Sequence, residues 1–304
     1  MRKIKILIFI LFFFFFLLSF LIFPIFFLKK EGEGQQIFPR SFTLLLPKKK
    51  NKNSISFGEK AGVAIFFSSE GKEKILYQKN PHQKLPPASL TKLMTAMIVL
   101  DHYDLSQKVE ISYQALWTEG EAGKLRPGEK MKIEDLLKLM LLVSSNDAAT
   151  ALEEVAGKDK FKEWVKKKEK EIRLQNTNFL NPHGLYQKEH SSSAYDLAKM
   201  TYFSLVKYKK LWEILRKKEE VIIGEGPKRK ILHYAHNTNK LLDLENVLGG
   251  KTGYLPEVGE SMILALKSFG KTKGYVILVL IGVDDRIQKM KKFHSYIKNE
   301  FLWK

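Results

Sequence analysis

Ser89 and Lys92 are the residues of this sequence whose types and spacing first suggest chemistry. Pro86 and Pro87 stop the chain before them, and the apolar residues after them recur at helical spacing. Positions three apart lie on one face of a helix, so the lysine amine can reach the serine hydroxyl. A lysine pushed towards neutrality by burial or by nearby cations can take the hydroxyl proton while the serine attacks a substrate. Taken alone, the pair is more simply a helix cap and a solvated lysine.

A second group, Ser144-Ser145-Asn146, interrupts two segments with helical periodicity, 133–143 and 148–156. A loop can aim Ser144 and Asn146 at one point, whereas positions two apart on a helix diverge. By itself this group is better explained as the cap of the next helix.

A third group, Lys251-Thr252-Gly253, follows two glycines at the start of a predicted strand, 248–254. Gly253 would let another backbone approach closely, because glycine has no side chain. By itself the tripeptide is better explained as a turn with an exposed lysine.

The order of the predicted elements indicates an α+β fold. Strands at 63–67 and 74–77 precede a mostly helical stretch, 103–210. A predicted hairpin of 220–223 and 231–234, further strands and a final amphipathic helix close the chain. Such an order suits one antiparallel sheet that is built from both ends of the chain.

The three groups together, S-x-x-K, S-x-N and K-T-G, form the pattern of penicillin-binding proteins and serine β-lactamases. The chain resembles the D-alanyl-D-alanine carboxypeptidases, which are low-molecular-mass penicillin-binding proteins. The resemblance runs from about Gly58 to about Trp303. Further matching segments are Ile75–Asn80, Pro127-Gly128-Glu129, Asn181-Pro182-His183-Gly184-Leu185, Asn237–Leu242 and Tyr254 after the third group.

The resemblance implies a β-lactamase/transpeptidase-like fold, with an antiparallel sheet of N- and C-terminal strands, flanking helices and an inserted all-helical lobe. It implies that Ser89 is the nucleophile, that Lys92 takes its proton, and that Ser144 relays a proton to the leaving D-Ala. No metal or other cofactor is required. The implied partners are a peptidoglycan stem peptide that ends in D-Ala-D-Ala and β-lactam antibiotics as inhibitors.

The same resemblance assigns the substrate-binding residues. Asn146 would hold the substrate amide, and Lys251 with Thr252 would bind the terminal carboxylate beside Gly253. The backbone N–H groups of Ser89 and Tyr254 would form the oxyanion hole.

Three positions depart from the family pattern, namely Ser145, Thr238 and Leu255. We expect Ser145 to crowd its loop and the other two to weaken contacts with the substrate. His183 is expected to tie down a turn, and Glu153 and Glu154 to be exposed helix residues. The motifs leave open a D,D-endopeptidase, a serine β-lactamase and a catalytically weak scaffold.

The net charge of +19 is spread over runs of lysine, and the chain has no cysteine. Disulfides and thiolate metal sites are therefore excluded. A solvated basic surface explains the charge best, and attraction to anionic lipid or cell-wall polymer is the alternative. Binding to nucleic acid is not expected, because no recognition motif accompanies the charge.

Residues 1–30 carry Arg2, Lys3 and Lys5 before an apolar run from Ile6 to Leu28. The run is long enough for a membrane span, which needs about 20 residues, and no small-residue cleavage site follows it. We therefore expect a membrane anchor over 1–30, a tether over 31–57 and a catalytic domain over 58–304 outside the cytoplasm. A cleaved signal sequence and a secreted protein are the alternative.

This reading predicts that the mature protein keeps residues 1–28 and stays with membranes in high salt. Edman sequencing of the native protein should begin at the N-terminus of the chain. A sequence that begins beyond residue 30 would refute the anchor.

Overall fold

The computed structural model describes residues 46–50, 55–120 and 123–304. The predicted membrane anchor and most of the predicted tether lie outside these ranges. Within them, no helix is both long enough and apolar enough to cross a bilayer.

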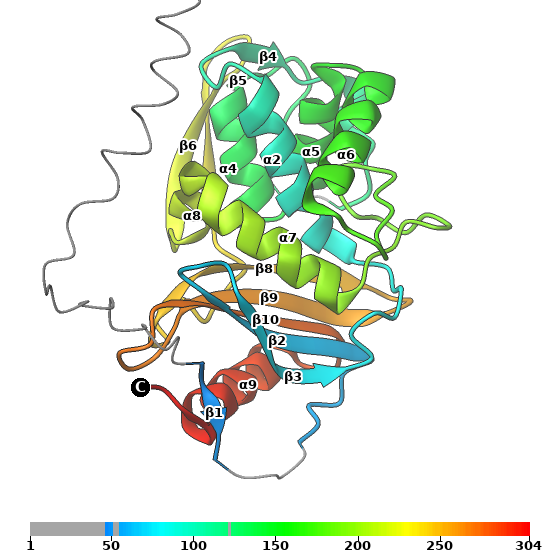
Figure 1. Ribbon diagram of the computed structural model, residues 1–304. Helices are drawn as coiled ribbons and strands as arrows, with labels where there is room; N and C mark the ends of the chain where they lie inside the picture. Colours follow the sequence, from blue (N-terminus) through cyan, green and yellow to red (C-terminus); the bar gives the residue numbers. More distant parts are fainter. Residues whose placement is uncertain (1–45, 51–54, 121–122) are drawn as a thin grey trace, which may run out of the picture. The chain divides into compact units, whose positions relative to one another are not determined.

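A five-stranded antiparallel sheet forms the base on which the site is built (Figure 1). Its strand order is β3-β2-β10-β9-β8, so strands from both ends of the chain lie side by side, as the sequence predicts. The strands are β2 (Ala61–Ser68), β3 (Glu73–Lys79), β8 (Val247–Leu255), β9 (Gly259–Lys267) and β10 (Gly274–Val283).

Both faces of this sheet are covered, which explains why β2, β9 and β10 are almost continuously apolar. Along β2, Val63 and Ile65 belong to the core beneath the helical lobe, and Ala64 and Phe66 belong to the core on the opposite side. Successive side chains of a strand point to opposite faces, so each strand contributes to both cores.

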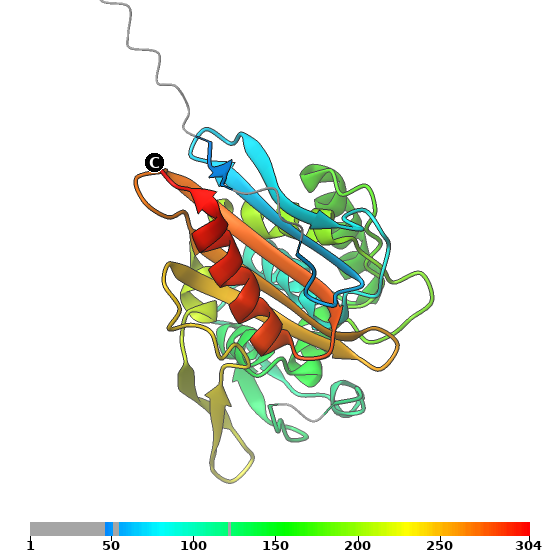
Figure 2. The ribbon, with the colours of Figure 1, turned by 90° about the horizontal axis from the view of Figure 1, so that it is seen from below.

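The helix α9 (Arg286–Glu300) covers the face that is turned away from the helical lobe (Figure 2). Met290, Phe293 and Ile297 lie three to four positions apart and are fully buried against the sheet. This confirms the predicted amphipathic helix at the end of the chain.

The other face carries the inserted lobe, which begins with the short 3₁₀ helix η1 (Ala88–Thr91). Its helices are α2 (Lys92–His102), α3 (Tyr113–Leu116), α4 (Ile133–Leu142), α5 (Asn146–Glu154), α6 (Lys158–Ile172), α7 (Ala194–Lys207) and α8 (Lys209–Leu215). Residues of α7 pack on the central strands.

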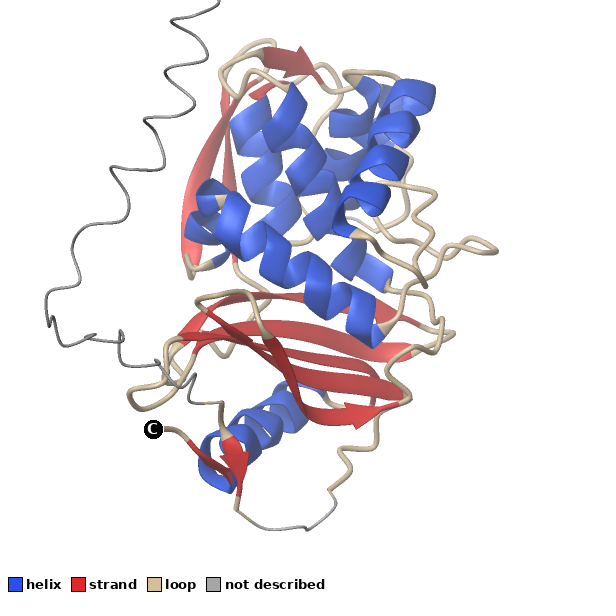
Figure 3. Cartoon of the chain, viewed as in Figure 1, coloured by secondary structure: helices blue, strands red, loops and turns tan. Residues whose placement is uncertain are grey.

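The prediction of an all-helical lobe is wrong. The lobe contains a second antiparallel sheet in the order β4-β5-β6-β7, visible at its edge in Figure 3. Its strands are β4 (Lys108–Glu110), β5 (Lys130–Lys132), β6 (Glu219–Glu225) and β7 (Lys230–His236). β4 and β5 have three residues each, too few to show an alternating pattern, and the predicted hairpin of β6 and β7 joins them instead of the central sheet.

Two parts of the predicted tether belong to the folded domain. β1 (Lys48–Lys49) pairs with β11 (Phe301–Leu302) at the end of the chain. Phe57 is buried and packs on Phe293, with a ring-centroid distance of 4.5 Å. The fold therefore includes residues on the N-terminal side of Gly58.

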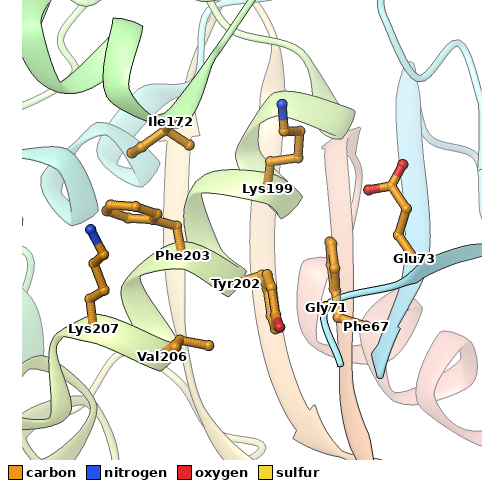
Figure 4. A pocket seen from close by; sticks show the side chains of 9 residues that line it. All are labelled: Phe67, Gly71, Glu73, Ile172, Lys199, Tyr202, Phe203, Val206 and Lys207. Carbon is orange, nitrogen blue, oxygen red and sulfur yellow. The ribbon is translucent and has the colours of Figure 1, made fainter. Parts of the chain in front are cut away.

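An apolar hollow of about 310 Å³ lies between α7, α6 and the β2–β3 turn (Figure 4). Phe67 and Tyr202 stack in its wall with a centroid distance of 4.1 Å. None of its lining residues belongs to the three motifs, so this hollow is separate from the candidate site.

A buried polar contact in the lobe holds the segment that leads to the second motif. The His233 ring on β7 lies 2.6 Å from a carboxylate oxygen of Glu129 and 2.8 Å from the carbonyl oxygen of Gly123. Gly123 in turn packs against Ser145, since a Cβ at Gly123 would lie 2.8 Å from the Ser145 hydroxyl. Burial is the largest single effect and opposes the charge on His233, but the hydrogen bond to Glu129, the charge of Glu129 and the Gly123 carbonyl together outweigh it, and the pKa of the ring is raised.

We predict that His233→Gln destabilises the protein most at low pH. A histidine whose pKa is raised by folding stabilises the fold fully below its unfolded value, and this contribution fades as the pH rises through the folded value. Thermal unfolding at pH 5.5 should show a loss of about 1–3 kcal/mol. A loss that is larger at pH 8.5 than at pH 5.5 would contradict the assignment.

Candidate active site

Ser89 and Lys92 meet where the 3₁₀ helix η1 joins α2. Ser89 belongs to η1 and Lys92 is the first residue of α2. Side chains three apart are nearly aligned in a 3₁₀ helix, and the Lys92 Nζ lies 2.8 Å from the Ser89 Oγ. Ser89 is partly exposed, whereas Lys92 is completely buried. The hydroxyl can therefore meet a substrate while the amine stays away from water.

The Lys92 amine is held by three acceptors from three separate segments. It lies 2.8 Å from the Ser89 Oγ, 2.6 Å from the Asn146 Oδ1 and 2.7 Å from the carbonyl oxygen of His183. The oxygens of Asn146 and His183 can only accept, so the lone pair of the neutral amine is left to accept the proton of the Ser89 hydroxyl. Burial, followed by the positive charge of Lys251, lowers the pKa of Lys92 well below its usual range, and Asp147 opposes the shift. The amine is thereby prepared to act as a base.

Ser144 lies in a break between α4 and α5, as the sequence predicts. Its backbone is left-handed, with φ of 64°, and this ends the path of α4. Ser145 then caps α5, because its hydroxyl accepts a hydrogen bond of 3.0 Å from the N–H of Ala148. The expectation that Ser145 crowds the loop is wrong, since its buried side chain satisfies a helix terminus.

Lys251 connects the second and third motifs. Its Nζ donates to the Ser144 Oγ at 2.8 Å and to the carbonyl oxygen of Thr252 at 3.1 Å. Burial and then the positive charge of Arg286 lower the pKa of Lys251 to about 7. Ser144 thus has a partner that can donate or accept a proton near neutral pH.

Strand β8 runs very close to the nucleophile. A Cβ added at Gly253 would lie 3.0 Å from the Cβ of Ala88 and 3.3 Å from the backbone nitrogen of Ser89. The close approach that the sequence suggests for Gly253 is therefore present. This approach places the backbone next to Tyr254 near the N–H of Ser89. The side chain of Tyr254 is exposed.

Further contacts come from residues without a distinctive sequence pattern. The carbonyl oxygen of Glu119 accepts a 2.6 Å hydrogen bond from the Asn146 Nδ2, and this fixes the orientation of the amide. Arg286, at the start of α9, donates to the carbonyl oxygen of Gly253 at 3.2 Å and pairs with Glu260. Arg286 could not be predicted as part of the site, because nothing in the local sequence indicates that α9 begins beside β8.

The structure accommodates Thr238 and Leu255, two positions that depart from the family pattern. The Thr252 hydroxyl donates to the Thr238 hydroxyl at 2.7 Å, and the Leu255 side chain is buried.

His183 accepts a 3.1 Å hydrogen bond from the N–H of Leu185, consistent with its expected role in a turn. Burial and the charge of Lys92 lower the pKa of His183 to about 3, so the ring is a weak base.

Glu153 and Glu154 are not exposed helix residues, so that expectation is wrong. Glu153 is buried, and burial raises its pKa to about 7. Glu154 is half-buried and accepts a hydrogen bond of 2.8 Å from the Ser112 hydroxyl. Helical periodicity alone does not reveal that other segments cover this end of α5.

Comparison with known proteins agrees with this geometry. The model of peptidase family S11, described as D-alanyl-D-alanine carboxypeptidase, matches residues 53–285. The chain belongs to this family. D-alanyl-D-alanine carboxypeptidase DacF of Bacillus subtilis is 36% identical over 217 residues, which cover 69% of this chain and 54% of DacF. The chain thus spans about half the length of that relative.

Other relatives and solved structures give the same picture. A D-alanyl-D-alanine endopeptidase of Escherichia coli is 28% identical over 232 residues, covering 74% of this chain and 73% of the relative. Penicillin-binding protein 5 from Haemophilus influenzae superposes with a TM-score of 0.70 at 27% identity, covering 81% of this chain and 72% of that one. The Streptomyces K15 DD-transpeptidase shares the fold, with a TM-score of 0.72 at 23% identity and coverage of 80% and 98%. The predicted α+β, transpeptidase-like fold is confirmed.

We predict that Lys251→Met moves the pH dependence of Ser89 acylation to higher pH. Without the charge of Lys251, the pKa of Lys92 rises, so a higher pH is needed to deprotonate it. The rate at pH 7 should fall by about tenfold or more. The measurement is the rate of acylation by benzylpenicillin between pH 6 and 10, with the exposed Lys267→Met as control. An unshifted profile would show that Lys251 does not influence Lys92.

Proposed function

We propose that this chain is a serine D-Ala-D-Ala carboxypeptidase that removes the terminal D-alanine from peptidoglycan stem peptides. The proposal depends mainly on the buried Lys92 amine, which lies 2.8 Å from the hydroxyl of the partly exposed Ser89. A serine needs such a base to become an effective nucleophile. Membership of the S11 family supports this reaction over other uses of the same geometry.

In the first step, the Ser89 Oγ forms a bond to the carbonyl carbon of the penultimate D-Ala, and its proton passes to the Lys92 nitrogen. The carbonyl oxygen becomes an oxyanion. The N–H groups of Ser89 and Tyr254 stabilise that oxyanion, and the close passage of β8 at Gly253 supports their convergence. The Asn146 amide, held by the carbonyl of Glu119, would bind the peptide backbone.

In the second step, the bond to the terminal D-Ala nitrogen breaks. Ser144 passes a proton to that nitrogen and is resupplied by the Lys251 amine, 2.8 Å away. An ester of Ser89 and free D-alanine result. Water then attacks the ester and gives one proton to the Lys251 amine, Lys92 returns its proton to the Ser89 oxygen as the ester bond breaks, and the shortened peptide leaves with a new carboxyl group.

Recognition of the terminal carboxylate would come from β8 and its surroundings. The Thr252 hydroxyl and the Lys251 amine lie on this strand, and Arg286 contributes a second cation through its contact with Gly253. Two cations beside one strand would attract a carboxylate.

A D,D-endopeptidase is the second candidate, because relatives such as that of Escherichia coli carry this name. The two reactions form the same acyl-enzyme and differ in whether free D-alanine or a cross-linked peptide leaves. Both predict an acyl-enzyme on Ser89 with β-lactams, and assays on cross-linked muropeptides distinguish them.

We also propose that residues 1–30 hold the protein at the cell membrane, with the catalytic domain on the extracytoplasmic side. The apolar run from Ile6 to Leu28 supports this placement. It agrees with a substrate in the cell wall, which lies outside the membrane.

We predict that benzylpenicillin adds one covalent adduct to the full-length protein, at Ser89. Mass spectrometry with peptide mapping should find the adduct in the wild type and in Ser295→Ala, which changes an exposed serine on α9, and should not find it in Ser89→Ala. The wild type should release D-alanine from a pentapeptide that ends in D-Ala-D-Ala, and Ser89→Ala should lose this activity by at least about a thousandfold.

A folded wild-type protein that forms no adduct would favour the catalytically weak scaffold. Rapid, repeated hydrolysis of the penicillin would instead indicate a β-lactamase. Release from cross-linked dimers without release of D-alanine would favour the endopeptidase.

A further inference from the structure

The hairpin of β6 and β7 carries apolar side chains that the fold leaves uncovered. The hairpin stands at the edge of the helical lobe (Figures 1 and 2). Its inner face is buried, and Ile222 and Ala235 on that face belong to the core beneath the lobe. Successive side chains of a strand alternate between the two faces. The outer face therefore holds the side chains between them, and four of these are large, apolar and at least half exposed: Val221, Ile223, Leu232 and Tyr234.

The register of the two strands makes these four side chains one continuous patch, which we call the hairpin patch. Val221 lies opposite Tyr234, and Ile223 lies opposite Leu232. Opposed side chains on one face of an antiparallel pair lie in contact. Single exposed apolar residues need no explanation, but a contiguous patch on a surface indicates a binding site.

Basic residues adjoin the hairpin patch. The turn between the two strands carries the exposed run Lys228-Arg229-Lys230, and β5 adds the exposed Lys130. Lys130 pairs in register with Glu225, which lies opposite Lys230, so all three share the outer face. In the described part of the chain, none of the four basic side chains forms a hydrogen bond or an ion pair.

The carboxylates of this face do not reverse its charge at the turn. The Glu225 carboxylate lies 2.7 Å from the Lys108 amine, and Glu110 lies opposite Lys130 in the ladder. Glu219 lies at the end of the hairpin away from the turn. The hairpin patch is therefore bordered by net positive charge on the side of its turn.

An apolar patch with a basic border matches the surface of a membrane that contains anionic lipids. Apolar side chains of such a patch enter the boundary between headgroups and acyl chains, while Lys and Arg remain at the lipid phosphates. Tyr234 suits this boundary, because its ring is apolar and its hydroxyl can stay in contact with water. Shape and charge thus both fit a lipid surface.

The small size of the hairpin patch also favours a membrane over a second copy of the chain. A stable dimer needs roughly 20–30 residues from each partner, whereas this patch has four large apolar side chains. A contact of this size is effective where another part of the protein already holds the partner nearby. Residues 1–30, which we propose as a membrane anchor, would hold the domain beside the bilayer in this way.

Contact through the hairpin would also orient the catalytic site. Two residues after β7 ends, the Thr238 hydroxyl accepts a 2.7 Å hydrogen bond from the Thr252 hydroxyl of the third motif. The hairpin is thus joined directly to the strand that passes the nucleophile. A membrane that holds the hairpin would therefore fix the direction in which the site opens.

We propose that the outer face of the β6–β7 hairpin docks on an anionic lipid surface. The hairpin patch enters the headgroup boundary, and the basic residues of the turn contact lipid phosphates. This inference goes beyond the proposed reaction and rests on the proposed placement of the protein at the membrane.

The test places one dye at a time on the full-length protein, which has no cysteine of its own. Leu232→Cys, in the hairpin patch, and Ser295→Cys, on the exposed side of α9, each carry an environment-sensitive nitrobenzoxadiazole dye. Each protein is incorporated from outside into preformed vesicles that contain a nitroxide quencher on a lipid headgroup. The vesicles are phosphatidylcholine alone or phosphatidylcholine with about 30% phosphatidylglycerol.

Docking predicts a difference between the two dye positions. With phosphatidylglycerol, quenching should be at least about twofold stronger at position 232 than at position 295, because only the hairpin patch meets the headgroups. The difference should shrink in phosphatidylcholine alone and at high salt, because the basic residues then lose their attraction to the surface.

Two double variants in the Leu232→Cys protein separate the two contributions. Ile223→Ser/Tyr234→Ser removes apolar surface, and Lys228→Gln/Arg229→Gln removes two charges. Each should lower the ratio of docked to undocked protein by about fivefold or more.

Matched controls change the same residue types elsewhere. Val206→Ser/Tyr113→Ser alters two other exposed apolar side chains, and Lys167→Gln/Lys170→Gln alters two exposed lysines of α6. Both controls should leave quenching at position 232 unchanged. All four double variants should react with benzylpenicillin at the wild-type rate, which verifies that they are folded.

Equal quenching at positions 232 and 295 would overturn the docking, and so would controls that act as strongly as the patch variants. A dye response at position 232 to soluble poly(glycerol phosphate), without one to vesicles, would assign the face to a wall polymer instead. Self-quenching between labelled copies without lipid would assign it to a second copy.

Washing with high salt separates this inference from the proposed anchor. Protein that leaves the vesicles in high salt, after a clear difference between the two positions at low salt, would sustain the docking and refute the anchor. Protein that stays in high salt and shows no difference at low salt would sustain the anchor and overturn the docking.

Discussion

The placement of one buried amine, that of Lys92, is the constraint on which the rest of the site depends. An ammonium group without water is tolerable only if acceptors surround it, and a neutral amine is useful only if a hydroxyl lies within reach. The chain meets both requirements with Ser89 from η1, Asn146 from α5 and a carbonyl from the loop at His183. Three segments that are far apart in the sequence must fold correctly before the nucleophile can be activated.

A second buried amine, that of Lys251 on β8, also lies beside a serine hydroxyl. Its bond to Ser144 links the sheet to the lobe, and its charge helps to keep Lys92 deprotonated. The approach of β8 to η1 allows this, and glycine at 253 favours the approach because a Cβ there would lie 3.0 Å from the Ala88 Cβ. The backbone approach at Gly253 and the charge of Lys251 therefore both act on the pair of Ser89 and Lys92.

Much of this could be predicted from the sequence, because the decisive spacing is local. Ser89 and Lys92 are three residues apart, and the continuous apolar runs of β2 and β10 show in single segments. The rest depends on contacts between distant segments. β4 and β5 are too short to be assigned, and their union with the hairpin of β6 and β7 joins distant segments. The burial of Glu153 arises from segments that fold over α5, and Arg286 reaches β8 only because α9 starts where β10 ends. No local pattern encodes these arrangements.

The pairing of β2 with β10 has a consequence for how the protein folds. Val63 lies opposite Val279, so the middle of the central sheet joins residues separated by most of the domain. Bringing such distant segments together is slow, because the entropy of closing the chain is lost before the contacts form. Until β10 has been synthesised, the hairpin of β2 and β3 exposes an apolar face and an unpaired strand edge, which are the features that promote aggregation. This hairpin therefore remains exposed in the newly made chain until β10 (Gly274–Val283) has emerged.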